Sequence, residues 1–336
     1  MKRKVVFLII LLSIFTFTMV FNSSNIGAAD VDSFPERDIT LIIGYGAGGG
    51  TDLIGRQLAK NAEKFVDVNV NVVNITGGAS VPSMTDLLSK KPDGYTVQLT
   101  TPVFCQYHHI SEDIDWSYED FTRIMNVGSD PFVISCNPEL PWENIDDLVE
   151  DAKNNPGKYA GAIVAPGVIW GDSMIAFVES VGIYDEVKII PNPLGTAGCL
   201  QSVVGGHTDF LAVSAGEVFD HVKAGKLNLI GVSGDERNPN FPEVPTINEQ
   251  GYDVYPVSNF RGLIAPPGMD EAIKQKLHDI FKKAMEEQEF IDFMNGRGMQ
   301  ILYLSGDEYN KFLEEQDEWF GNFYENSQFY QDRAEE

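Results

Sequence analysis

The sequence predicts an α/β fold in two domains, each a mostly parallel sheet flanked by helices. Short apolar runs rich in β-branched residues alternate with amphipathic stretches of helical spacing, which is the pattern of parallel strands joined by crossover helices. The alternation occurs once up to about residue 101 and again from about 133 to 250. Two crossings, near 125–132 and 250–260, join the halves, so a hinge is expected there.

The first residues predict a cleaved signal peptide over 1–29. Lys2–Lys4 form a basic start, Val5–Phe21 is apolar, and Gly27–Ala29 offers small residues for cleavage. An uncleaved membrane anchor is the rival interpretation. No cysteine follows the apolar run as a lipid attachment site, so we expect an exported protein, periplasmic or extracellular.

A strand, a glycine loop and a helix come next. Ile39–Ile43 is a buried strand, Gly44–Gly50 is the loop, and Leu53, Ile54 and Leu58 recur at helical spacing. A glycine loop leaves backbone N–H groups uncovered at the helix N-terminus, where the helix dipole favours anions. The first expectation for a ligand is therefore an anion.

The same loop spells GxGxxG with Gly44, Gly46 and Gly49. Dinucleotide binding also needs an acidic residue after the second strand, and Val68–Val73 is followed by Asn74 instead. Dinucleotide binding is thus disfavoured, and a tight turn without a ligand stays open as the plain alternative.

The third strand, Tyr95–Thr101, follows a helix through Met84 and Leu87. Ligands in parallel sheets gather beyond the carboxyl ends of the strands. The hydroxyls of Thr100 and Thr101 are therefore expected near the glycine loop.

The second half repeats the strand–helix pattern. Its strands are expected at Phe132–Ser135, Tyr159–Val164, Val187–Ile190, Asp209–Val213 and Leu227–Val232, with helices beginning near Asn144, after the loop 165–173, and at Thr196.

The chain then returns to the first domain. Phe260–Ala265 and Gln300–Leu304 are expected strands, and Ser305–Glu308 reads as a capping box for the closing helix. Domain I would comprise 30–131 and 257–336, and domain II 132–256.

Composition limits the classes of partner. The formal net charge is −26, so nucleic acid and anionic membranes are not expected to bind through the overall field. An anion site must then be built locally from backbone N–H groups and helix ends. The acidity itself is most simply explained by solubility.

Cysteines and histidines indicate no metal site and no cofactor. Cys105, Cys136 and Cys199 fit no metal spacing, and the odd number leaves at least one free thiol with any disulfide pairing open. His108 and His109 are adjacent, and adjacent side chains diverge on a regular strand or helix.

Several motifs, in order, resemble the exported substrate-binding proteins of tripartite tricarboxylate transporters, the TctC or Bug family. They are Gly48-Gly49-Gly50-Thr51-Asp52 with Arg56, Asn74 with Gly78-Ala79, Pro92-Asp93-Gly94-Tyr95-Thr96, Gly205-Gly206 with Asp209, Arg237 with Pro242-Glu243-Val244-Pro245-Thr246 and Glu249-Gln250-Gly251, and Arg261-Gly262 with Ala265-Pro266-Pro267-Gly268. The resemblance spans about 34 to 304.

This resemblance implies a type II periplasmic-binding-protein-like fold that closes on a small carboxylate: a di- or tricarboxylate, an amino-acid-like acid or an aromatic acid. It also implies delivery to the large and small membrane subunits of a transporter, by a monomer without catalytic residues. Asp209 would brace a loop. The ligand-binding residues carried over, with their near neighbours, are Tyr45, Gly46, Ala47, Gly48, Gly49, Thr51, Asp52, Thr100, Thr101, Gly167, Trp170, Asp172, Ser173, Gly195, Thr196 and Ala197.

The chain departs from the family pattern at three places. Gly44 stands for a usual proline, Asn192 for a usual aromatic, and the segment 167–173 lacks the usual histidine and carries Trp170. Trp170 and the missing histidine bear on the distal end of the ligand, where a bulkier or aromatic acid and a plain packing role for Trp170 both stay open. Two other functions stay open: a carboxylate-sensing subunit of a signalling system, and an exported hydrolase, although no G-x-S-x-G motif occurs.

Overall fold

The computed structural model describes residues 31–334. The predicted signal peptide, 1–29, lies outside the described residues. Met1–Phe34 and Pro35–Glu336 are separate compact units. In the first, the structure describes only Val31–Phe34, which include the 3-10 turn η1 (Val31–Ser33). All the strands and α-helices that the structure describes belong to the second unit. Over 31–334, no helix combines the length and apolarity that crossing a membrane requires.

Strands of the second unit form one continuous mixed sheet. The order is β2-β1-β3-β9-β4-β7-β5-β6, with β8 and β10 also paired to β4. The strands are β1 (Ile39–Ile43), β2 (Val70–Asn74), β3 (Thr96–Thr100), β4 (Thr122–Cys136), β5 (Ala160–Ile163), β6 (Lys188–Pro191), β7 (Phe210–Ser214), β8 (Asn228–Val232), β9 (Ser258–Ala265) and β10 (Leu304–Ser305).

Parallel pairs lie at both ends of this sheet, and antiparallel pairs lie in its middle. β1 pairs in parallel with β2 and β3, and β5 pairs in parallel with β6 and β7. The long strand β4 runs antiparallel to β7, β8 and β9, and β9 is also antiparallel to β3. The predicted α/β class is confirmed, and the two crossings are β4 and the chain leading into β9.

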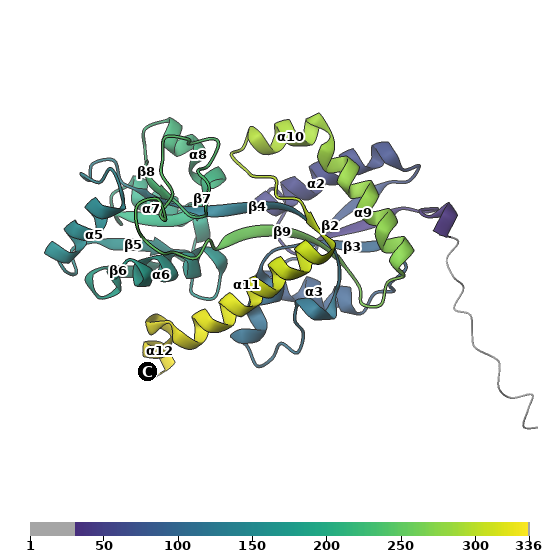
Figure 1. The fold of residues 1–336 in the computed structure, drawn as a ribbon, viewed down its shortest axis with the longest axis horizontal. Helices are drawn as coiled ribbons and strands as arrows, with labels where there is room; N and C mark the ends of the chain where they lie inside the picture. Colours follow the sequence, from purple (N-terminus) through teal and green to yellow (C-terminus); the bar gives the residue numbers. More distant parts are fainter. Residues whose placement is uncertain (1–30, 335–336) are drawn as a thin grey trace, which may run out of the picture. The chain divides into compact units, whose positions relative to one another are not determined.

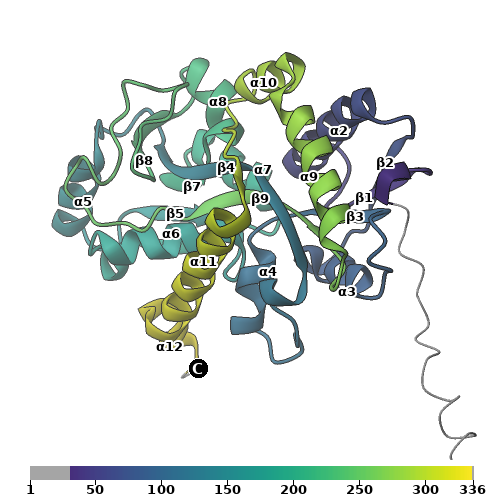
Figure 2. The same cartoon turned by 45° about the vertical axis from the view of Figure 1, so that its right-hand side comes forward.

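Helices flank the sheet in two groups (Figures 1 and 2). The helix α2 packs on α9 and α10 beside β1–β3, whereas α6 and α7 pack on β5 and β7. The helix α11 packs on α4 and β4. The bounds are α2 (Gly50–Ala62), α3 (Val81–Leu88), α4 (Val103–Gln106), α5 (Ile145–Asn154), α6 (Ile169–Ser180), α7 (Gly195–Val204), α8 (Ala215–Lys223), α9 (Glu271–Glu286), α10 (Gln288–Asn295), α11 (Gly306–Asn326) and α12 (Gln328–Ala334).

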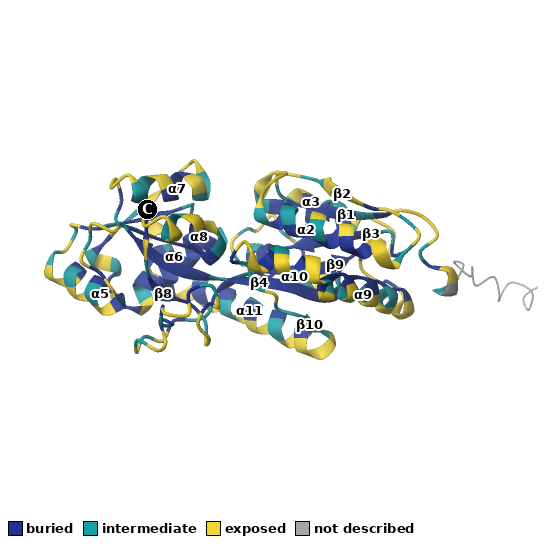
Figure 3. Ribbon diagram, turned by 90° about the horizontal axis from the view of Figure 1, so that it is seen from above, coloured by how far each residue is buried: buried dark blue, intermediate teal, exposed yellow. Residues whose placement is uncertain are grey.

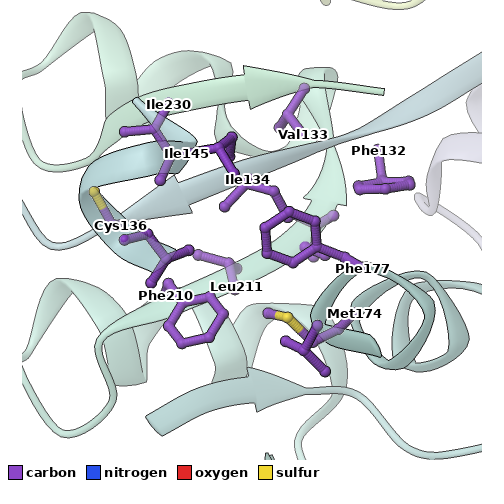
Figure 4. Close-up of a cluster of buried hydrophobic side chains, with 14 of the residues drawn as sticks. Phe132, Val133, Ile134, Cys136, Ile145, Met174, Phe177, Phe210, Leu211 and Ile230 are labelled. Carbon is purple, nitrogen blue, oxygen red and sulfur yellow. The ribbon is translucent and has the colours of Figure 1, made fainter. Parts of the chain in front are cut away.

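Apolar side chains from strands and helices fill the interior between these layers. One cluster gathers Ile134, Phe177, Phe210 and Leu211, all fully buried (Figure 4). A second cluster, around Phe104, packs near the start of β9. Figure 3 shows that burial follows the strands, while the outer faces of the helices are exposed. This two-sided burial explains the near-continuous apolar strand sequences.

Two predictions near the C-terminus are wrong. The strand expected over Gln300–Leu304 is only Leu304–Ser305, because only these two residues pair with β4. The Gln300 carbonyl accepts a single hydrogen bond from Ser129 N of β4 without continuing the pairing. Ser305 is the N-cap of α11 but makes no side-chain cap. Its Oγ lies 2.9 Å from Tyr303 Oη instead. The domain boundaries at 131/132 and 256/257 stay a prediction.

Candidate functional site

A cavity of about 570 Å³ opens where several helices begin. Its lining comes from the loop before α2, from the segment after β3, from the helix starts of α6, α7 and α8, and from β9. The lining residues are Tyr45, Gly49, Gly50, Thr51, Leu53, Ala79, Thr101, Pro102, Val103, Gln106, Tyr107, Asp130, Val164, Val168, Ile169, Trp170, Gly195, Thr196, Ser214, Gly216, Glu217, Asn259, Arg261 and Met299.

Three helix N-termini at this cavity have no side-chain cap. The N-cap residues of α2, α6 and α7 are Gly49, Val168 and Leu194, which carry no hydrogen-bonding side chain. The first N–H groups of each helix therefore lack the usual side-chain oxygen partner. Helix α8 differs, because Ser214 and Glu217 close a capping box there. Uncapped N-termini that share one cavity are suited to binding an anion.

Asp52, in the first turn of α2, holds the preceding loop in place through hydrogen bonds. This carboxylate accepts hydrogen bonds from Gly48 N (2.8 Å), Arg56 Nε (2.9 Å) and Asn74 Nδ2 (2.8 Å). Asn74 Nδ2 also donates to the Tyr45 carbonyl, so the end of β2 holds the loop. Burial alone would raise the pKa of Asp52, but the three donors together lower it.

The loop before α6 is braced in the same manner by Asp172. Its carboxylate accepts hydrogen bonds from Gly167 N (2.9 Å), Gln106 Nε2 (2.7 Å), Tyr324 Oη (2.5 Å) and Tyr330 Oη (2.5 Å). All of these donors are neutral. Burial raises the pKa of Asp172 to about 6 although the four hydrogen bonds lower it.

A buried ion pair lies at the wall formed by β4 and β9. Arg261 Nη2 lies 3.2 Å from Asp130 Oδ2, and Arg261 Nε donates to Thr51 Oγ1 at 3.1 Å. Burial raises the pKa of Asp130 and also that of Glu217. The guanidinium is thus largely balanced within the wall, and the side chains bring no net positive charge to the cavity.

The polar lining also includes a hydroxyl pair and an amide. Tyr45 Oη lies 2.6 Å from Thr101 Oγ1. Asn259 Oδ1 is buried and has no hydrogen-bond partner within the part of the chain that the structure describes. Trp170, Val168 and Ile169 add an apolar part to the lining. A ligand that fits must present polar ends to the helix N-termini and an apolar body between them.

A sequence profile described as tripartite tricarboxylate transporter family receptor, TctC, matches residues 54–327. The chain belongs to the TctC family. Among curated relatives, the UPF0065 protein in the gbd 5′ region of Cupriavidus necator is 33% identical over 290 residues, which are 85% of this chain and 86% of that protein. Members of this family are solute-binding receptors.

Solved structures of TctC-like proteins share the fold. A TctC solute-binding protein from Polaromonas superposes with a TM-score of 0.76 at 27% identity, over 87% of this chain and 99% of that one. Two proteins of Rhodopseudomonas palustris show the fold at lower identity. One, solved with adipate, has a TM-score of 0.76 at 20% identity over 88% and 98% of the two chains. MatC, solved with malate, has a TM-score of 0.70 at 19% identity over 86% and 99%.

The structure brings part of the predicted TctC site residues together. The cavity is lined by Tyr45, Gly49, Thr51, Thr101, Trp170, Gly195 and Thr196. Outside its lining are Gly46, Ala47, Gly48, Asp52, Thr100, Gly167, Asp172, Ser173 and Ala197. Among the latter, Asp52 and Asp172 brace the loops, and Ser173 Oγ donates to the Ile169 carbonyl.

Sequence reasoning missed the wall made by Asp130, Glu217, Asn259 and Arg261. Arg261-Gly262 was noted only as part of a motif, although a charged residue inside an apolar strand signals a buried partner. The loop-bracing role expected for Asp209 stays a prediction; its Oδ2 accepts a hydrogen bond from Ala160 N, the first residue of β5, at 2.7 Å. Cys105, Cys136 and Cys199 are all free and buried.

Proposed function

We propose that this TctC protein binds a small organic acid at the cavity and delivers it to a tripartite transporter after export. The observation that carries the proposal is the meeting of three uncapped helix N-termini, those of α2, α6 and α7, at one cavity. Each N-terminus carries roughly half a positive charge and has N–H donors that no side chain caps. Carboxylate groups match both features.

The size and composition of the cavity favour a ligand with two acidic ends. A volume of about 570 Å³ lies in the range of small-molecule sites. The adipate and malate of the two R. palustris structures are both dicarboxylates, and those proteins share this fold. Main-chain dipoles attract a carboxylate even though the net charge of the chain is −26. We therefore place a dicarboxylate first, with an aromatic acid against Trp170 as the variant to test beside it.

A thermal-shift panel of mono-, di- and tricarboxylates, amino acids and aromatic acids tests the ligand class. The right acid should stabilise the folded protein by about 2.7 kcal/mol at a hundred times its dissociation constant, which raises Tm. A panel in which no acid raises Tm would contradict the proposal. Mass spectrometry of the compound that co-purifies identifies the acid independently.

Replacing Gly49 with valine tests the role of the first loop. A side chain at this cavity-lining N-cap would cover the N–H groups of α2, and its Cβ would lie 3.3 Å from the Gly46 carbonyl. Acid binding should weaken at least about tenfold, which is about 1.4 kcal/mol, while the fold is retained. Gly46→Ala is the matched control, because a Cβ there meets nothing within 4 Å. Unchanged affinity in Gly49→Val would remove the loop from the site.

Delivery requires export and membrane subunits. Peptide mapping of the protein recovered from its native cells should show an N-terminus near Asp30. Uptake of the identified acid should then need this protein together with a large and a small membrane subunit. Uptake that persists in cells without this protein would favour the sensing alternative.

A further inference from the structure

The adjacent histidines do not diverge as the sequence predicted. His108 and His109 end a single 3-10 turn, η4 (Tyr107–His109), after which the chain leaves helical geometry. Their ring centroids are 3.9 Å apart, and the rings are tilted by 40°. The prediction was wrong because it assumed a regular element, and a one-turn segment lets both rings face α11.

Both imidazoles reach the same oxygen on α11. His108 Nε2 lies 3.1 Å and His109 Nε2 lies 3.4 Å from Asp317 Oδ1. One donor atom from each of the three residues lies within 4.8 Å of the other two. The side chains are only 22–24% exposed, so the cluster is partly sheltered from bulk water.

Within the described part of the chain, several polar atoms of this cluster have no hydrogen bond of good geometry. Among residues 31–334, Asp317 Oδ1 and His109 Nε2 are buried atoms without a hydrogen-bond partner, and so is His108 Nδ1. Unpaired buried polar atoms cost free energy unless something else binds them.

We propose that His108, His109 and Asp317 form a binding site for one divalent transition-metal cation, with Zn²⁺ as the reference ion. Zinc takes imidazole nitrogen and carboxylate oxygen at about 2.0–2.1 Å in tetrahedral geometry, so two of its ligands are about 3.3 Å apart. The separations of 3.1 and 3.4 Å match that edge. Two nitrogens and one oxygen suit zinc and its neighbours, and the fourth position is left to water.

Gly321 gives independent support for a shaped site. It lies one helical turn after Asp317 on α11, and a Cβ placed there would approach His109 Cε1 to 3.0 Å and Nδ1 to 3.3 Å. Glycine inside a helix destabilises it relative to alanine, so a glycine here indicates that a neighbouring group packs too closely to leave room for a side chain. Here the missing side chain lets the His109 ring lie against the helix beside Asp317.

The position of the site links it to the acid cavity. Tyr107 and Gln106 line that cavity and come directly before the two histidines. A bound cation would join this segment to α11, because its ligands come from both (Figure 2 shows α11 running past α4). Metal binding should therefore raise Tm even when no organic acid is present.

The test is a titration of the untagged, chelator-treated protein with Zn²⁺ alone, followed by calorimetry. One equivalent should bind, and Co²⁺ in its place should give the intense visible absorption of a tetrahedral site. His109→Gln and Asp317→Asn should each weaken binding at least tenfold. His207→Gln is the matched control, because His207 is exposed and distant in sequence from the cluster, and it should bind like the wild type.

Folding controls separate the loss of a metal ligand from the loss of the fold. Circular dichroism and the unchanged acid affinity of each variant establish that it folds. Gly321→Ala should weaken Zn²⁺ binding several-fold without removing a ligand. No saturable Zn²⁺ binding, or binding that survives in both His109→Gln and Asp317→Asn, would overturn the site and leave the cluster a plain ion pair. The acid-binding proposal is untouched by either result.

Discussion

The loops before α2 and α6 use the same device with opposite electrostatics. Each places an aspartate in the first turn of the following helix, and each carboxylate accepts an N–H from the loop, Gly48 N for Asp52 and Gly167 N for Asp172. Asp52 adds a cationic partner, Arg56, whereas the donors to Asp172 are all neutral. The pKa of Asp52 is lowered and that of Asp172 is raised to about 6.

This contrast shows that bracing a loop and fixing its charge are separate functions. Asp52 is ionised near neutral pH, because its pKa lies below the ordinary value. Asp172 titrates within a mildly acidic range. Two of its donors, Tyr324 and Tyr330, come from α11 and α12, so the C-terminal helices hold the second loop and are absent from the first.

The largest expected change in stability comes from Gly171 of α6, which packs against the backbone of the loop before that helix. A Cβ at Gly171 would lie 1.7 Å from the Ala165 carbonyl oxygen, a backbone atom that cannot move aside cheaply. Gly171→Ala should therefore destabilise the protein by about 4 kcal/mol or more, measured by urea unfolding. In the first loop, Gly46→Ala meets nothing within 4 Å and should stay within about 0.5 kcal/mol of wild type. Equal effects in both loops would contradict the comparison.

The next effect concerns pH. The folded-state pKa of Asp172 is about 6 against an ordinary value of 3.8, so the folded state binds the proton more tightly. Its contribution to stability is fully present below about pH 4 and is lost as pH rises through about 6, by about 3 kcal/mol in all. In urea unfolding from pH 4 to 7, the wild-type minus Asp172→Asn difference in unfolding free energy should fall by most of that amount, about 2.4 kcal/mol.

Asp52 should behave with the opposite sign. Its folded-state pKa is lowered, so its contribution is present above the ordinary pKa and is lost as pH falls below it. The wild-type minus Asp52→Asn difference should therefore stay flat from pH 5 to 7 and shrink only in acid. Two difference curves of the same slope would show that burial does not separate the two aspartates.

The sequence predicted the first loop much better than the second. The apolar run Ile39–Ile43, the glycines and Asp52 lie within one short stretch of sequence. Their spacing alone therefore predicts a strand, a loop and the start of a helix. Asp172 depends on partners at 106, 324 and 330, whose approach follows from how α11 and α12 pack on α6. No periodicity encodes such contacts. The cluster of His108, His109 and Asp317 and the ion pair of Arg261 and Asp130 were not predicted for the same reason, because their partners are far apart in the sequence.

The smallest expected effect is the difference between two side-chain coupling energies, one at each aspartate. Arg56 is 48% exposed while Asp52 is 1% exposed, so water screens this ion pair and its coupling should be at most about 0.5 kcal/mol. Asp172 is fully buried and Tyr324 is half-buried, so their hydrogen bond is less screened and its coupling should exceed about 1 kcal/mol. Double-mutant cycles with Asp52→Asn and Arg56→Gln, and with Asp172→Asn and Tyr324→Phe, measure both couplings at pH 7. If the exposed pair coupled as strongly as the buried one, the difference between the loops would lie in their backbones and not in the surroundings of the two carboxylates.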